Sequence, residues 1–243
     1  MTGGRHEISP QLYARIGGFL YLIIIVAGLG DELFIRGAMV VSGDAAATAR
    51  NITASPLLWR VGIAGDLVMH MCDVGLMLVF YVLLRPVNRN LALLALIANL
   101  VQSAMLVANK TNLLVPLFLL GDADYLKAFT PEQRQALAYV SLRTHDYGFG
   151  FGLNFFGIAC LVVGYLMAKS GYLPKLLGIL MQIAGVSYLV NSFALILNPP
   201  LAATLFPAIL LPPFVAELSV ALWFVVKGVD LEKWRGLAHD IND

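Results

Sequence analysis

Long apolar runs separated by short polar segments dominate the chain. They recur from Leu12 to Val226, and each run is bounded by charged residues or by clusters of Gly, Pro and Asn. The hydrocarbon core of a bilayer is crossed by about 20 consecutive apolar residues in helical form. The pattern therefore predicts six membrane-spanning helices, over residues 12–35, 57–84, 91–119, 138–168, 173–197 and 207–227, with the third kinked near Pro116.

These runs favour helices over strands, because they lack an alternation of apolar and polar positions and a membrane barrel needs many more segments. We therefore expect an all-α fold: a polytopic membrane protein with a single integral membrane domain over residues 1–243, built as a bundle of six transmembrane helices. Residues 228–243 form a short tail. In it, Trp234 stands between Lys233 and Arg235, which is typical of a helix lying at the level of the lipid headgroups.

The composition agrees with a membrane class. Hydrophobic residues make up 59% of the chain and charged residues 13%, whereas a soluble domain carries about 25% charged residues. The lipid bilayer is thus the expected partner. The net charge of +1 and the absence of basic blocks exclude nucleic acid as a partner. Cys72 and Cys160 lie inside apolar runs, which indicates small buried side chains rather than a disulfide or a zinc motif.

The distribution of Lys and Arg predicts the orientation. The short connections 85–90 and 169–175 contain basic residues and no acids, whereas 121–137 carries Asp122, Asp124 and Glu132. Basic connections stay on the cytoplasmic side of a membrane. We therefore expect both termini in the cytoplasm.

Ionisable residues gather on the second predicted helix. Asp66, His70 and Asp73 are spaced at i, i+4 and i+7, so they lie within about 60° of one another around the helix. Each mid-helix Asp costs about 2.5–3.5 kcal/mol on insertion into a membrane. This face is therefore expected to point into the bundle or into a water-filled cavity.

The other predicted helices supply further polar groups to the same, outer half of the membrane. The fourth carries Arg143, His145 and Asp146 close together. Across all six helices, acids outnumber bases, and we expect them to surround an outward-facing acidic pocket. The acids are Asp31, Glu32, Asp66, Asp73, Asp146 and Glu217, and the bases are Arg60, Lys110 and Arg143. An alternative reading is that Asp66, His70 and Asp73 only bind neighbouring helices and fix their packing.

A metal site is a further hypothesis. His70 and His145 are the two histidines within predicted spans, and with a carboxylate such as Asp66 they would form a set of two histidines and one carboxylate. That set suits zinc or iron. A divalent metal is the one cofactor that the sequence suggests.

Three segments carry a resemblance to a known family. They are Phe155–Gly178, Leu83–Ala92 and Tyr13–Gly18. In these segments the chain resembles the bacterial membrane proteins classified as domain of unknown function 4386, and the likeness spans nearly the whole chain. The resemblance implies a small helical protein of the bacterial cytoplasmic membrane, and it implies no particular activity.

Three functions remain open from the sequence. The first is binding or transport of a cation, a proton or a small amphipathic ligand through the acidic pocket, for which the candidate residues are Asp66, His70, Asp73, Arg143, His145, Asp146, Glu217, Lys110 and Arg60. The second is an intramembrane metal-dependent hydrolase that uses His70, His145 and a carboxylate. The third is a structural or accessory membrane subunit.

Overall fold

The computed structural model describes residues 9–239, and these residues form helices and no strand. The outer segments 1–8 and 240–243 lie outside the described residues, and with them Arg5, His6 and the end of the predicted tail. The helices that form the bundle are α1 (Pro10–Asp31), α4 (Pro56–Leu84), α5 (Arg89–Asn109), the short α6 (Thr111–Leu119) that continues α5, α7 (Pro131–Lys169), α8 (Lys175–Leu197) and α10 (Leu211–Val226). The shorter elements are η1 (Glu32–Arg36), α2 (Gly37–Met39), α3 (Ala45–Ala54), η2 (Asp124–Ala128), α9 (Pro199–Leu205), η3 (Ala208–Leu210) and α11 (Leu231–His239).

Six helical segments are long and apolar enough to cross a membrane, as the hydropathy pattern predicts. They run over Pro10–Met39, Pro56–Leu84, Arg89–Leu119, Pro131–Lys169, Lys175–Leu197 and Ala208–Val226. The third segment is interrupted at Lys110, between α5 and α6, whereas Pro116 lies inside α6. The break therefore falls six residues before the predicted kink.

The fourth segment begins at Pro131, seven residues before the predicted start at 138. Thr130 accepts a hydrogen bond from the Gln133 backbone, and the Gln133 side chain accepts one from Thr130 N–H. This reciprocal capping box, followed by Pro131 at the first helical position, begins the helix within polar sequence. α7 thus has 39 residues and a length of about 58 Å, well beyond the hydrocarbon thickness of about 30 Å.

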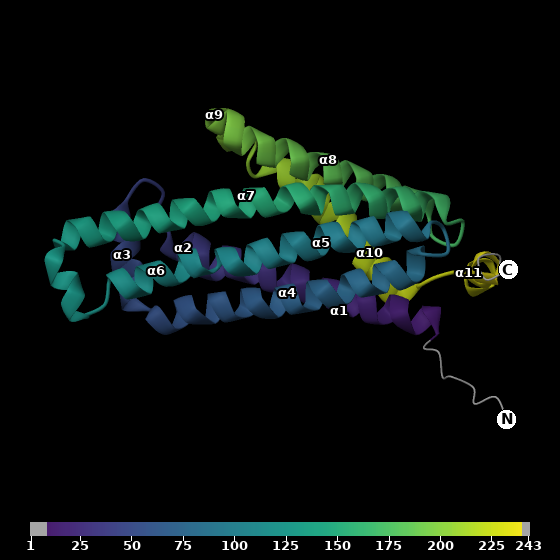
Figure 1. Cartoon of the computed structure of the whole chain (residues 1–243), viewed down its shortest axis with the longest axis horizontal. Helices are drawn as coiled ribbons and strands as arrows, with labels where there is room; N and C mark the ends of the chain where they lie inside the picture. Colours follow the sequence, from purple (N-terminus) through teal and green to yellow (C-terminus); the bar gives the residue numbers. More distant parts are fainter. Residues whose placement is uncertain (1–8, 240–243) are drawn as a thin grey trace, which may run out of the picture.

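Exposed charges mark the edges of an apolar belt. On α4 the exposed residues Arg60 and Arg85 are about 38 Å apart, and on α7 Asp146 and Lys169 are about 35 Å apart. Between them, the outward-facing positions of α4 are apolar, including Val68, Met71 and Leu78. This belt matches a hydrocarbon core of about 30 Å with its interfaces. α7 extends past it, and Figure 1 shows α7 reaching well beyond α9.

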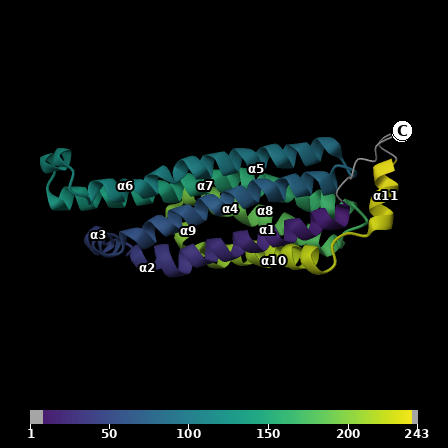
Figure 2. The same cartoon turned by 90° about the horizontal axis from the view of Figure 1, so that it is seen from below.

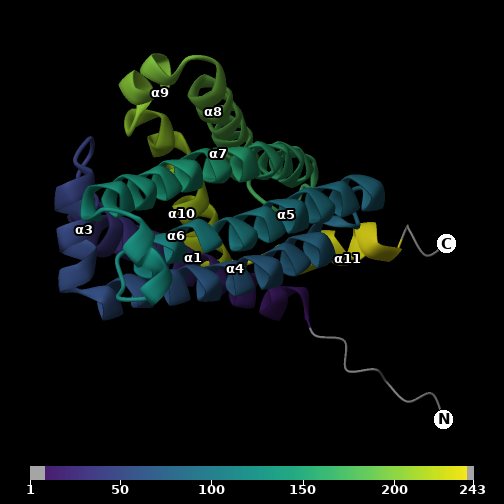
Figure 3. The ribbon, with the colours of Figure 1, turned by 60° about the vertical axis from the view of Figure 1, so that its left-hand side comes forward.

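The helices pack in two closely associated groups. α1 lies between α4 and α10, while α7 lies between α5 and α8. α3 lies crosswise at one end of the bundle, and α11 lies crosswise at the other, near both described ends of the chain (Figures 1 and 2). Figure 3 shows α3 and the α6–α7 connection at the same end. We call this the α3 end and the opposite one the α11 end.

Glycines allow the closest helix contacts. A Cβ atom at Gly178 of α8 would lie 2.5 Å from the backbone nitrogen of Ala168 on α7, and one at Gly185 would lie 2.7 Å from the carbonyl oxygen of Gly157. A Cβ at Gly18 of α1 would lie 2.8 Å from the carbonyl oxygen of Ala221 on α10. These positions exclude any larger side chain without movement of a backbone.

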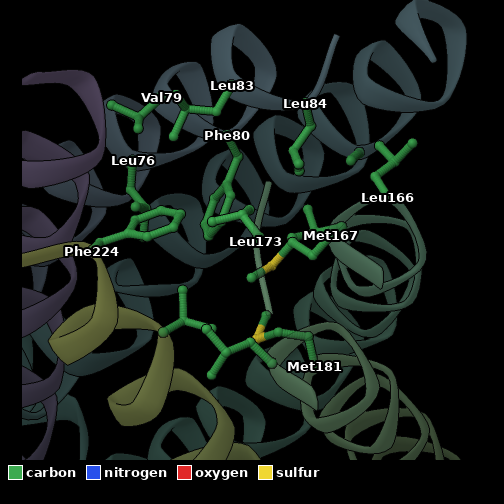
Figure 4. Close-up of a cluster of buried hydrophobic side chains, with 14 of the residues drawn as sticks. Leu76, Val79, Phe80, Leu83, Leu84, Leu166, Met167, Leu173, Met181 and Phe224 are labelled. Atoms are coloured by element: carbon green, nitrogen blue, oxygen red, sulfur yellow. The ribbon is translucent and has the colours of Figure 1, made fainter. Parts of the chain in front are cut away.

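Apolar side chains fill the interior toward the α11 end. Figure 4 shows this cluster, to which α4, α7, α8, α10 and the α7–α8 connection contribute Leu76, Val79, Phe80, Leu83, Leu84, Leu166, Met167, Leu173, Met181 and Phe224. A smaller apolar cluster at the α3 end contains Met39, Ile52, Trp59, Ile63, Leu113 and Leu142. Buried polar residues lie between the two clusters along the bundle. Cys160 is buried, Cys72 is half-buried, and both are free thiols.

Candidate functional site

A buried ionic cluster joins three parts of the chain at the inner edge of the α3 end. Asp66 Oδ2 lies 2.7 Å from Lys110 Nζ and 3.2 Å from Arg36 Nη1. The Arg36 guanidinium also pairs with Asp31. We call these four residues, Asp31, Arg36, Asp66 and Lys110, the ionic cluster. Asp66 is only 1% exposed and Lys110 3%, so their charges are balanced by one another rather than by water.

Two local irregularities bring the basic residues into the cluster. Arg36 is the last residue of η1, a π-helical turn that continues α1. A π turn inserts an extra residue and changes the direction of the following side chains, and it is frequent at functional sites. Lys110 stands at the break between α5 and α6, where its N–H contacts the carbonyl oxygens of Leu106 and Val107.

The ionic cluster lies at one edge of the apolar belt. Asp66 is about 28 Å along α4 from Arg85, and Lys110 is about 32 Å along α5 from Arg89. The packing around Asp31, Arg36 and Trp59 leaves no space for a water molecule. Two acids face two bases. The cluster is therefore charge-balanced and tightly packed, with the Arg36 side chain 20% exposed, in contrast to the open acidic pocket expected from the sequence.

One reason for this difference is that the cluster contains Arg36, which lies one residue beyond the first predicted helix and was not among the predicted site residues. A second reason is that three predicted site residues lie on the surface. Arg60 is exposed, and so are Arg143 and Asp146, which pair with each other at 3.0 Å on the surface of α7. These three residues lie outside the buried cluster. Glu32 is 59% exposed and only borders Arg36, at 4.0 Å.

Both predicted histidines are buried near the ionic cluster. His70 of α4 and His145 of α7 are 3% and 5% exposed, and the Nε2 atom of each makes no hydrogen bond to the described residues. Within residues 9–239, however, no three His, Cys, Asp or Glu side chains converge closely enough to hold a metal ion. The set of His70, His145 and Asp66 is thus not assembled as a ligand sphere. Asp66 is instead paired with two cationic side chains.

Asp73 lies deeper and has different partners. Its Oδ2 accepts a hydrogen bond from Ser103 Oγ at 2.7 Å, and its Oδ1 accepts one from Asn99 Nδ2 at 3.3 Å. Gln102 Oε1 lies 3.4 Å from Asn99 Nδ2. Asn99, Gln102 and Ser103 form the polar face of α5 that contacts α4 at this depth. Asp73 is about 18 Å along α4 from Arg85, which is near the middle of the apolar belt.

Glu217 lies at a similar depth, about 15 Å along α10 from Lys227. Its Oε1 accepts a hydrogen bond from the Tyr188 hydroxyl of α8 at 2.5 Å. The Tyr21 side chain lies near the same carboxylate. Tyr21 and Asp73 in turn line one cavity of about 10 Å³. That volume is at the lower limit for a single water molecule.

The two deep carboxylates share one property: within the described part of the chain, neither lies in an ion pair with Lys or Arg, in contrast to Asp66. Among residues 9–239, their hydrogen-bond partners are hydroxyl and amide groups. We call Asp73 and Glu217 the deep carboxylates.

Sequence reasoning included both deep carboxylates among the candidate residues but named none of their hydrogen-bond partners. Asn99, Gln102 and Ser103 carry a readable signal, since three polar residues at i, i+3 and i+4 in an apolar helix share one face. Tyr188 carries none, because a tyrosine in a membrane helix is common.

The fold and these buried groups define a polytopic α-helical membrane protein with ionisable side chains at two depths of its interior. The chain belongs to the family described as domain of unknown function (DUF4386), whose model matches residues 16–228. This confirms the resemblance found in the sequence. An uncharacterized protein of Archaeoglobus fulgidus is 26% identical over 171 residues, which cover 70% of this chain and 86% of that relative. No solved structure matches the chain.

Proposed function

We propose that this protein is a membrane carrier that takes up a monovalent cation or a proton at the deep carboxylates, Asp73 and Glu217. The observation that carries the proposal is the pair of buried carboxylates near mid-depth, whose partners in the described part of the chain are hydroxyl and amide groups.

An uncompensated carboxylate in a low-dielectric interior is costly, and a bound proton or cation removes that cost. Acidic residues at such depth characteristically mark ion pathways in membrane proteins. Neither deep carboxylate is needed to neutralise a basic side chain, since the half-buried Arg36 and the buried Lys110 already pair with Asp31 and Asp66. A purely structural role would be served as well by an amide, because Asn and Gln also hydrogen-bond between helices.

The surroundings support a carrier rather than an open channel. The ionic cluster closes the interior toward the α3 end, and the apolar cluster around Phe80 and Phe224 closes it toward the α11 end. An ion held between two closed ends is released when either end opens. The proposal takes both termini as cytoplasmic in the cytoplasmic membrane of a bacterium, so that the ionic cluster faces the outside.

The test is ion flux into vesicles. Protein reconstituted in liposomes is given an inward gradient of proton or of Na⁺, and internal pH or Na⁺ is followed with an entrapped fluorescent indicator. Asp73→Asn and Glu217→Gln should each lower the flux of the transported ion by about tenfold or more, because each removes a charge at mid-depth.

The matched control is Asp146→Asn, which makes the same chemical change at an exposed position on α7. It should keep the flux of the unmodified protein. Equal flux in all four proteins, or flux no higher than in empty liposomes, would refute the proposal.

A further inference from the structure

One deep carboxylate lies beside three buried polar side chains. Asp73 of α4 faces Asn99, Gln102 and Ser103 of α5, and all four residues are less than a tenth exposed. Ser103 Oγ lies 2.7 Å from Asp73 Oδ2 and 3.3 Å from Gln102 Oε1. Four oxygens thus gather in one small region, two from the carboxylate, one from the Gln102 amide and one from the hydroxyl, and the Asn99 amide nitrogen contacts both Asp73 and Gln102.

The hydrogen bonds available to these oxygens are too few. A serine hydroxyl has one hydrogen, and the short contact assigns it to Asp73, so Gln102 Oε1 receives only the long contact of 3.4 Å from Asn99 Nδ2. Asn99 Oδ1 is fully buried and makes no hydrogen bond to the described residues. A buried amide oxygen without a donor costs about 1–3 kcal/mol. The region therefore carries an excess of electron-rich oxygen beside a carboxylate.

We propose that Asp73, Asn99, Gln102 and Ser103 form a binding site for a sodium ion. Carboxylate, amide and hydroxyl oxygens are the ligands that hard cations prefer. One carboxylate balances a single positive charge, whereas a divalent ion would leave a net charge buried in the membrane. Oxygens this close together suit a small ion, because the size of a coordination cage contributes to the choice between Na⁺ and K⁺.

A small cavity borders Asp73, and none of Asn99, Gln102 and Ser103 lines it. The cavity beside Asp73 has a volume of about 10 Å³ and is otherwise lined mostly by apolar side chains such as Leu76 and Phe156. A hydrated ion does not fit into it. An ion at Asp73 would therefore be held directly by the protein oxygens, with at most one water.

This inference rests on the proposed function and deepens it, because it names the ion taken up at one of the two deep carboxylates. It can be tested without transport. Purified protein in detergent is prepared in choline chloride, and its thermal unfolding midpoint is measured as NaCl or KCl replaces choline at constant ionic strength. A ligand that binds the folded state raises the midpoint with its concentration.

We expect a saturable rise in the midpoint with Na⁺, a smaller effect of K⁺ and no rise for Asp73→Asn. Ser103→Ala should shift the half-saturating Na⁺ concentration upward by about tenfold, as expected for loss of one interaction with a charge. The matched control is Ser187→Ala, which removes a buried hydroxyl that bonds only to the carbonyl oxygen of Ile183 within α8. It should respond to Na⁺ like the unmodified protein.

The outcomes separate this site from the proposed function. Equal midpoints in NaCl, KCl and choline chloride overturn the sodium site, and so does an unchanged Na⁺ response in both Ser103→Ala and Asp73→Asn. Should Asp73→Asn not fold, Ser103→Ala and ²²Na⁺ equilibrium dialysis of the unmodified protein decide. A sodium response through Asp73 without flux in vesicles supports the site and refutes the carrier. Proton flux lost in Asp73→Asn without any sodium response supports the carrier and refutes the site.

Discussion

The Asp66–Lys110 pair allows a quantitative test of how the α3 end is held together. The ionic cluster contains two acids and two bases, and Asp66 Oδ2 contacts both Lys110 Nζ at 2.7 Å and Arg36 Nη1 at 3.2 Å. Asp66→Asn leaves the buried Lys110 ammonium without a carboxylate. Removing one partner of a buried ion pair costs about 3–5 kcal/mol, because the remaining charge is uncompensated.

The complementary substitution should cost less. In Lys110→Met, Asp66 keeps the Arg36 guanidinium, so we expect a loss of about 1–3 kcal/mol. The double variant Asp66→Asn/Lys110→Met restores charge balance, since Asp31 and Arg36 still pair. Its loss should fall below the sum of the single losses by about 1–3 kcal/mol, the range measured for residues within one network.

The assay is reversible unfolding in mixed micelles as the mole fraction of SDS increases, followed by circular dichroism. The exposed pair of Arg143 and Asp146 provides the internal comparison: Asp146→Asn should cost less than about 1 kcal/mol, as is usual for surface ion pairs. If Asp66→Asn costs no more than Asp146→Asn, or if the double variant loses the full sum, the four residues do not act as one charge-balanced cluster.

Three further predictions concern packing and the α11 end. Gly178→Ala should destabilise the protein by about 1–3 kcal/mol in the same SDS titration, because its new methyl group would lie 2.5 Å from the α7 backbone. Tyr172 donates a buried hydrogen bond of 2.6 Å to the carbonyl oxygen of Leu83, and burial raises the pKa of its phenol. The stabilisation by this hydrogen bond is therefore fully present below about pH 10, the ordinary pKa of tyrosine, and is lost as the pH rises through the raised pKa. The difference in unfolding free energy between the unmodified protein and Tyr172→Phe should therefore shrink in alkaline titrations. The Lys233 ammonium lowers the pKa of Asp230, whose carboxylate accepts a hydrogen bond from the Lys233 N–H at the start of α11. The stabilisation of α11 by the ionised Asp230 is present above about pH 4 and is lost as the pH falls through the lowered pKa. Asp230→Ala should therefore speed trypsin cleavage in the tail at neutral pH.

The sequence was sufficient for the class of fold because hydropathy summed over a whole helix decides whether it enters a membrane. The depth of each polar residue in the membrane and the direction in which its side chain points were harder to predict. Arg143 and Asp146 were expected to face the interior from the outer part of the helix predicted over 138–168, but both are exposed and pair with each other on the surface of α7. Only His145 between them points inward. On a helix, neighbours in sequence face different directions, and apolar residues on all sides of a membrane helix conceal which direction is inside.

Arg36 shows a second limit of sequence reasoning. It follows the first apolar run and precedes a polar connection, so its sequence position suggests a loop. The π turn of η1 keeps it helical and brings its guanidinium to Asp31 and Asp66. A single extra residue in a turn leaves no hydropathy signal. The charge balance of the ionic cluster therefore could not be derived from the order of residues alone.

Glycine contacts and buried polar contacts occupy different positions in the bundle. The glycine contacts between helices lie within two groups, α1 with α4 and α10, and α7 with α5 and α8. Three of the polar contacts that cross between these groups involve buried carboxylates. Asp66 of the first group meets Lys110 of the second. Asp73 meets Ser103, and Glu217 meets Tyr188.

This division has a consequence for a carrier. Close contacts between glycine-containing helices resist sliding, because a backbone lies directly against its neighbour. Hydrogen bonds and ion pairs can exchange their partners for water or a bound ion when two surfaces separate. Movement of one group against the other would thus leave each group intact and expose both deep carboxylates along the same seam. Binding an ion at Asp73 would bridge α4 and α5 across that seam, so occupancy of the site and closure of the bundle would be linked through the same four side chains.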